Sequence, residues 1–89
     1  MGIAVETTAP ATYRVTVTSG ASTTHMVTVS PDYWRKLTGG RVPPEKLVEK
    51  SFEFLLERES NTSILRSFDL PVIQKYFPEY ERTIPGMLD

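Results

Sequence analysis

The chain has 89 residues, no cysteine and a formal net charge of −1. This length suits one domain, and the missing cysteines exclude disulfides, thiolate nucleophiles and cysteine metal sites. No apolar run approaches the ~18 residues that a membrane span needs, and the first ten residues resemble no signal peptide, so we expect a cytoplasmic protein without a membrane partner.

The front of the chain carries a β pattern. Residues 1–10 could form a short strand, since Ile3 and Val5 alternate with other residues before Pro10. In TYRVTVT and HMVTVS, β-branched residues alternate with others, and SGASTT between them permits a turn. These runs predict a hairpin whose apolar face carries Tyr13, Val15, Val17, Val27 and Val29.

A short helix is expected next. Ser30 can cap it, Pro31 suits its first position, and Gly39-Gly40 ends it. Tyr33, Trp34 and Leu37 are its apolar residues. We expect Trp34 to pack between the hairpin and the following helix.

Pro43-Pro44 opens the main helix, which we extend to about Ser60. Its apolar residues recur at helical spacing: Leu47, Val48, Phe52, Leu55 and Leu56, with Ser51 among them. Another side carries Glu45, Glu49, Glu53 and Glu57, each four residues apart, with lysines between them. This row predicts a solvated helix face, and the alternative is an acidic docking surface for a basic partner.

The last third predicts an apolar turn at residues 64–68 and a short helix from Asp69-Leu70-Pro71 to Pro78. The sequence therefore predicts an α+β fold. A small β-hairpin sheet, three-stranded if residues 1–10 join it, packs against the main amphipathic helix and two short helices. One domain is expected over residues 1–82, with residues 83–89 as a flexible tail.

No constellation for chemistry is recognised. A lone histidine, His25, cannot build a metal site by itself, and its place beside the turn favours a half-exposed strand end. The late aromatic residues, Phe68, Tyr76, Phe77 and Tyr80, favour core packing over base stacking. We expect no catalytic residue, no metal and no cofactor, and hence no enzyme.

The stretch HMVTVSPDYWRKLTGGRVPPEKLVEKSFEFLLERE, residues 25–59, resembles ribbon–helix–helix repressors and antitoxins. The resemblance implies a strand that pairs with a second copy and reads DNA through Met26 and Thr28, with Leu47, Val48, Phe52 and Leu55 in the dimer core. The preceding strand, the short first helix and the extra C-terminal segment depart from that family. Arg14, Thr16 and Thr28 are the candidate nucleic-acid contacts on the hairpin.

A second stretch, FEFLLERESNTSILRSFDLPVIQKYFPEYE, resembles short bacterial proteins of unassigned function. This resemblance implies a bacterial origin and no particular activity.

Two functional hypotheses remain. The first is a small non-enzymatic protein-interaction or regulatory module with a protein partner or self-association, suggested by much apolar and aromatic surface in a short chain. The second is a ribbon–helix–helix-like DNA-binding regulator or antitoxin. The charge balance disfavours nucleic acid, because phosphate binding usually needs a basic excess.

Overall fold

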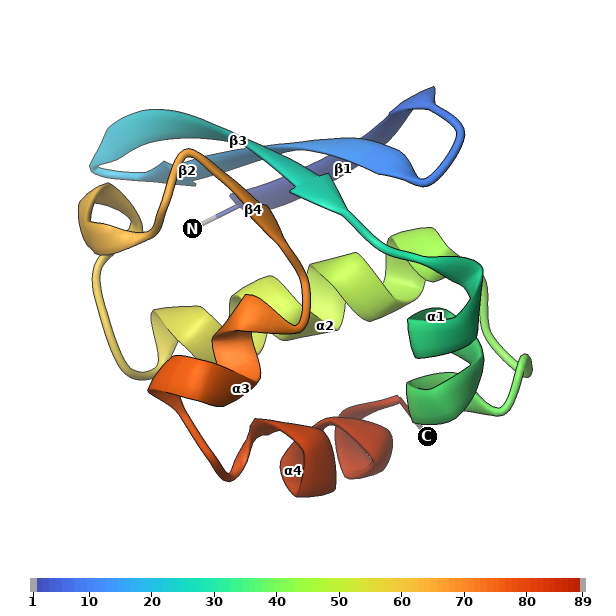
Figure 1. Ribbon diagram of the computed structural model, residues 1–89. Coiled ribbons are helices and arrows are strands. Elements are labelled where there is room, and N and C mark those ends of the chain that lie inside the picture. The colour runs from blue at the N-terminus through green and yellow to red at the C-terminus, as the bar shows by residue number, and fades with distance from the viewer. Residues whose placement is uncertain (1, 89) are drawn as a thin grey trace.

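A computed structural model describes residues 2–88 and shows an α+β fold (Figure 1). Along the chain the elements are β1 (Gly2–Ala9), β2 (Thr12–Ser19), β3 (Ala21–Thr28), α1 (Pro31–Thr38), α2 (Pro44–Leu56), the 3-10 turn η1 (Asn61–Ser63), β4 (Ser67–Asp69), α3 (Val72–Tyr76) and α4 (Tyr80–Met87). Among these residues, no helix is both long and apolar enough to cross a membrane.

The four strands form one sheet in the order β1-β2-β3-β4. β1, β2 and β3 are antiparallel neighbours, joined by tight turns in which Ala11 and Gly20 have positive φ. β4 runs parallel to β3, with Met26 opposite Ser67. The predicted hairpin is present as β2 and β3, and the N-terminal strand joins it as β1. β4 was not predicted, because three residues are too short to show an alternating pattern.

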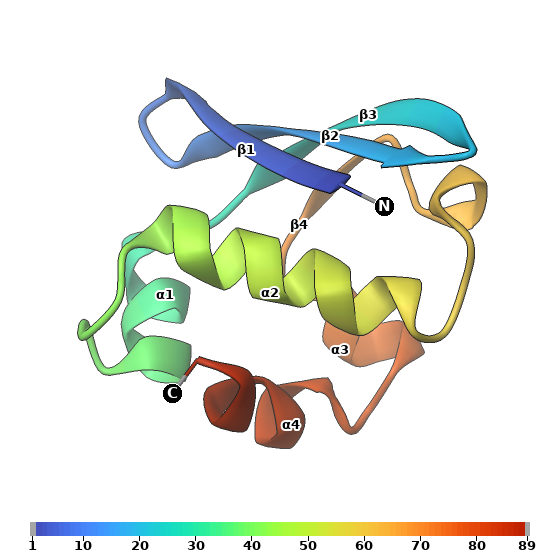
Figure 2. The same ribbon diagram turned by 180° about the vertical axis from the view of Figure 1, so that it is seen from behind.

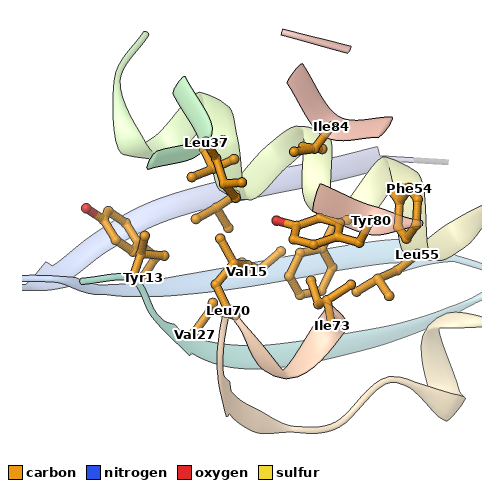
Figure 3. Close-up of a cluster of buried hydrophobic side chains, with 14 of the residues drawn as sticks. Tyr13, Val15, Val27, Leu37, Phe54, Leu55, Leu70, Ile73, Tyr80 and Ile84 are labelled. Atoms are coloured by element: carbon orange, nitrogen blue, oxygen red, sulfur yellow. The ribbon is translucent and has the colours of Figure 1, made fainter. Parts of the chain in front are cut away.

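All helices lie on one side of the sheet, and its other face is uncovered (Figures 1 and 2). α2 lies directly beneath the sheet and is itself covered by the C-terminal helices. Phe52 packs toward the sheet, with its ring 5.3 Å from that of His25 and 6.1 Å from that of Phe68. Phe54 packs the other way, at 5.2 Å from the ring of Tyr80. Figure 3 shows side chains of the sheet, such as Val15 and Val27, and side chains of the C-terminal helices, such as Ile73 and Tyr80, in one core.

The predicted apolar stripe of α2 is buried except for Leu56, which is half-buried, and the helix ends at Leu56, not near Ser60. Phe54, which the stripe did not include, is fully buried as well. The reason is that the sheet covers one side of α2 and the C-terminal helices cover another. A helix covered on two sides buries more than one stripe of residues.

The C-terminal residues differ from the expected flexible tail. Thr83 to Met87 belong to α4, and Ile84 is fully buried. Tyr80, also fully buried, shares a 2.6 Å hydrogen bond with Ser51 Oγ, and Glu81 accepts a hydrogen bond from the Tyr33 hydroxyl at 2.8 Å. These contacts hold α4 against α2 and α1; Asp89 lies outside the described residues.

Trp34 is half-buried and does not fill the space between the hairpin and α2. Its Nε1–H donates to the Val42 carbonyl at 2.8 Å, so the ring packs against the loop between α1 and α2. Tyr33 and Leu37, four residues apart, occupy the buried side of α1. A neighbouring residue on a helix is turned by about 100° from that side.

Candidate functional site

An apolar groove of about 250 Å³ lies where the end of α2, the segment from Ser63 to Phe68, and α3 meet. Its walls are Leu55, Ile64, Leu65, Phe68, Val72, Ile73, Tyr76 and Phe77, with Glu59 and Ser63 as polar members. We call it the apolar groove.

Two side chains on this groove remain exposed. Leu65 has 47% of its surface exposed and Tyr76 has 66%, and these are the large hydrophobic residues exposed in residues 2–88. A single exposed leucine is ordinary, but two such residues beside one hollow form a contiguous apolar patch. The groove therefore combines a buried apolar floor with exposed apolar walls.

Glu59 brings a carboxylate to the same groove. Partial burial raises its pKa, because desolvation disfavours the charged form. Within residues 2–88 no hydrogen bond or ion pair satisfies this carboxylate. A cation placed in the groove would therefore gain a partner that the fold itself does not provide.

A buried polar network fixes the backbone at Leu65. His25 is fully buried, and its Nδ1 lies 2.7 Å from the Leu65 carbonyl. Because a carbonyl only accepts, Nδ1 carries the hydrogen, and in the neutral ring Nε2 then accepts from Thr23 Oγ1 at 2.9 Å. Asn61 Nδ2 then donates to Thr23 Oγ1 at 3.1 Å and to the Ala21 carbonyl at 2.8 Å. The network ties β3 to η1 and to the wall of the groove.

The prediction that His25 is half-exposed is therefore wrong. The η1 segment covers the start of β3, and this long-range packing left no local signal. One signal was present: His25 alternates in step with Val27, on the apolar side of the strand. That alternation indicated burial.

A second hollow, of about 420 Å³, lies between β1 and α2 and is lined by Ile3, Glu49, Glu53, Leu56 and Glu57. We call it the β1–α2 groove. Three of the four glutamates of the predicted row, Glu49, Glu53 and Glu57, line this open groove and none of them is buried.

Glu45, the first glutamate of that row, fastens the far end of β1 to α2. It accepts a 2.6 Å hydrogen bond from Thr7 Oγ1, which lowers the pKa of its carboxyl group. α2 therefore runs antiparallel to β1, and the β1–α2 groove lies at the Ile3 end of the strand.

The candidate nucleic-acid contacts, Arg14, Thr16 and Thr28, lie on β2 and β3. Because side chains alternate between the two faces along a strand, all three lie on the uncovered face of the sheet. Arg14 is paired with Glu6 at 2.8 Å, Thr16 is half-buried, and Thr28 is exposed. Arg14 lies between Glu6 and Met26 in the strand register, so neither of its direct cross-strand neighbours is a cation.

The strand that resembles the intermolecular ribbon is β3. It is hydrogen-bonded to β2 on one side and, over Met26–Thr28, to β4 on the other. A central strand with neighbours from its own chain has no free edge in that stretch for a second copy. This arrangement does not fit a ribbon shared between two chains.

Over residues 2–88 no group of three or more histidines, aspartates and glutamates is placed to hold a metal ion. Comparisons with protein-family models, with curated proteins and with solved structures find no match.

Proposed function

We propose that this protein is a small non-enzymatic interaction module that holds an apolar side chain of a protein partner in the apolar groove. The observation that carries the proposal is the position of Leu65 and Tyr76. Within residues 2–88 these are the two large hydrophobic residues that are exposed, and both line the apolar groove. Apolar patches beside a hollow are typical of binding surfaces.

The chemistry of the groove specifies the partner segment. An aromatic or large aliphatic side chain would fill the floor formed by Leu55, Ile73 and Phe77. A lysine or arginine close to that anchor would pair with Glu59, whose partly buried carboxylate has no partner among the described residues. Apolar anchors near the centre of an interface dominate binding energy, and a charge pair adds specificity.

The proposal is tested by selecting binders from a displayed library of random peptides with the immobilised protein. We expect the selected peptides to share one large apolar residue with a lysine or arginine nearby. A synthetic peptide with the shared sequence is then measured by calorimetry. The double variant Leu65→Ser/Tyr76→Ser should bind it at least about tenfold more weakly.

Met26→Ser is the matched control, because it removes an apolar side chain from the uncovered face of the sheet and should leave binding unchanged. Peptides without a shared sequence, or equal binding by the Leu65→Ser/Tyr76→Ser variant, would overturn the proposal. A dimer of the protein that only this double variant dissociates would show that the groove receives a second copy.

A further inference from the structure

The edge of the sheet at β1 is unpaired over residues 2–88. β1 is the last strand on its side and pairs only with β2, so one row of its backbone N–H and C=O groups has no strand partner. Proteins commonly protect such edges with lysine, proline, a bulge or a very short strand. β1 has eight residues and contains neither lysine nor proline. Its pairing with β2 is regular from Gly2 to Thr7, and the irregularity lies only at its far end.

The opposite edge of the sheet is different. β4 has three residues, so it offers a strand of another chain only a short length to pair with. Strand addition needs several consecutive backbone groups. β1 is therefore the edge at which an extended segment can add.

The β1–α2 groove shows what such a segment would carry. Neighbouring side chains on adjacent strands point to the same face of a sheet, so residues opposite Ile3 and Val5 would point toward α2. There they meet Leu56 and the carboxylates of Glu49, Glu53 and Glu57. Lysine or arginine fits this position, because its aliphatic stem can cover apolar groups while its charged head reaches a carboxylate.

The cations close to this groove do not neutralise it. Lys50 lies 3.3 Å from Glu53, and Arg58 divides its contacts between Glu57 and Glu79. Glu49 has no ion pair in residues 2–88. Among residues 2–88, the three carboxylates that line the groove therefore outnumber the two cations paired with them.

A second copy of this chain does not fit the same edge. Antiparallel pairing of β1 with β1 of another copy would bring two α2 helices side by side beneath the joined sheet. Glu49, Glu53 and Glu57 of each copy would then face one another, and like charges in an interface are unfavourable. Charge complementarity favours a basic partner instead.

We propose that β1 and the β1–α2 groove form a docking site for an extended basic segment of another protein, with lysine or arginine at every second position. The segment extends the sheet by adding beside β1 and places its basic side chains on the glutamates of α2. This site is separate from the apolar groove and does not depend on the function proposed for it.

The test uses the full chain and three synthetic peptides: TKTKTKT, its acidic counterpart TETETET, and KKKTTTT, which has the same composition as the first without alternation. Binding is followed by nuclear magnetic resonance, together with hydrogen exchange of the backbone amides. We expect TKTKTKT to bind about tenfold more tightly than KKKTTTT, TETETET not to bind, and alternate amides of Gly2–Ala9 to gain protection only with TKTKTKT.

The variant Glu49→Gln/Glu57→Gln should weaken TKTKTKT binding about tenfold. Asp32→Asn/Asp69→Asn changes the net charge by the same amount away from the groove and should bind like the parent. Equal binding of the two basic peptides, binding without protection of β1 amides, no binding at millimolar peptide, or an unaffected glutamine variant would each overturn the proposal. Protection of β1 that grows with protein concentration alone would overturn it too, because a second copy would then occupy the edge.

Discussion

The two grooves of this protein differ in what they offer a partner. The apolar groove offers side chains: a floor of buried residues and two exposed walls, Leu65 and Tyr76. The β1–α2 groove offers unpaired backbone and negative charge. The first lies between the end of α2 and short elements of the last third of the chain, whereas the second lies between β1 and α2. A small domain can thus carry two binding surfaces of unlike chemistry on one core.

The largest expected effect concerns Phe52, whose ring contacts His25 and Phe68. Phe52→Ala should lower the free energy of unfolding by about 3–5 kcal/mol, because it leaves a cavity in a fully buried site. Phe68 also lines the apolar groove, so the exchange rates of backbone amides around this groove should increase more than those of β1. Urea denaturation measures the first effect. An alanine variant that melts within a degree or two of the parent would contradict it.

The next largest effect is expected for His25, and it should change binding at one groove but not at the other. His25→Ala removes the bond to the Leu65 carbonyl and leaves buried polar groups without partners, so stability should fall by about 2–3 kcal/mol. Binding at the apolar groove should weaken, while the β1–α2 groove keeps its affinity for TKTKTKT. Thr23→Val is the milder comparison, at about 1 kcal/mol, because the Leu65 bond remains. Equal loss of binding at both grooves would show that His25 supports only the fold as a whole.

Two glutamates should respond to pH with opposite sign. The Thr7 hydrogen bond lowers the pKa of Glu45 below its ordinary 4.5, so its stabilising effect is present above pH 4.5 and is lost as the pH falls through the folded-state value. Burial raises the pKa of Glu59 above 4.5, so its stabilising effect is present below pH 4.5 and is lost as the pH rises through the folded-state value. At pH 7, Glu45→Gln should therefore be slightly less stable than the parent, and Glu59→Gln slightly more stable.

Both differences should stay below about 0.5 kcal/mol and shrink under pH 4.5. Thermal melts of the parent and the two variants across this range measure them. Effects of the same sign would contradict the difference in environment between the two carboxylates.

The smallest effect is expected at the uncovered face of the sheet, a third surface that neither groove includes. The candidate nucleic-acid contacts on this face are Arg14, Thr16 and Thr28, and Arg14 is already paired with Glu6. A titration of labelled duplex DNA at two salt concentrations should show no tight binding and only a shallow salt dependence, because each phosphate contact contributes to that slope. Nanomolar binding that weakens steeply with salt would restore the DNA-binding hypothesis, and Arg14→Ala would then be the first variant to examine.

Local patterns were sufficient for β2, β3, the start of α1 and the buried stripe of α2. Alternating β-branched residues predicted β2 and β3, the Ser30 cap and Pro31 predicted the start of α1, and helical spacing predicted the buried stripe of α2 that includes Phe52. The glutamate row was also visible, since its spacing of four residues places its members on one side of a helix. These features depend on residues close together in the chain.

The tertiary structure alone decided what depends on distant residues. β4 exists because three residues pair with Met26–Thr28, about forty positions earlier, and α4 is ordered because Ile84 and Tyr80 cover α2. The same packing buried His25 under η1, turned Trp34 toward the loop at Val42, and placed Leu65 beside Tyr76. Such contacts leave no periodic trace in a sequence, because each joins segments whose own patterns are too short to indicate where they will pack. The glutamates could be read from the sequence, but only the fold put them beside the open edge of β1.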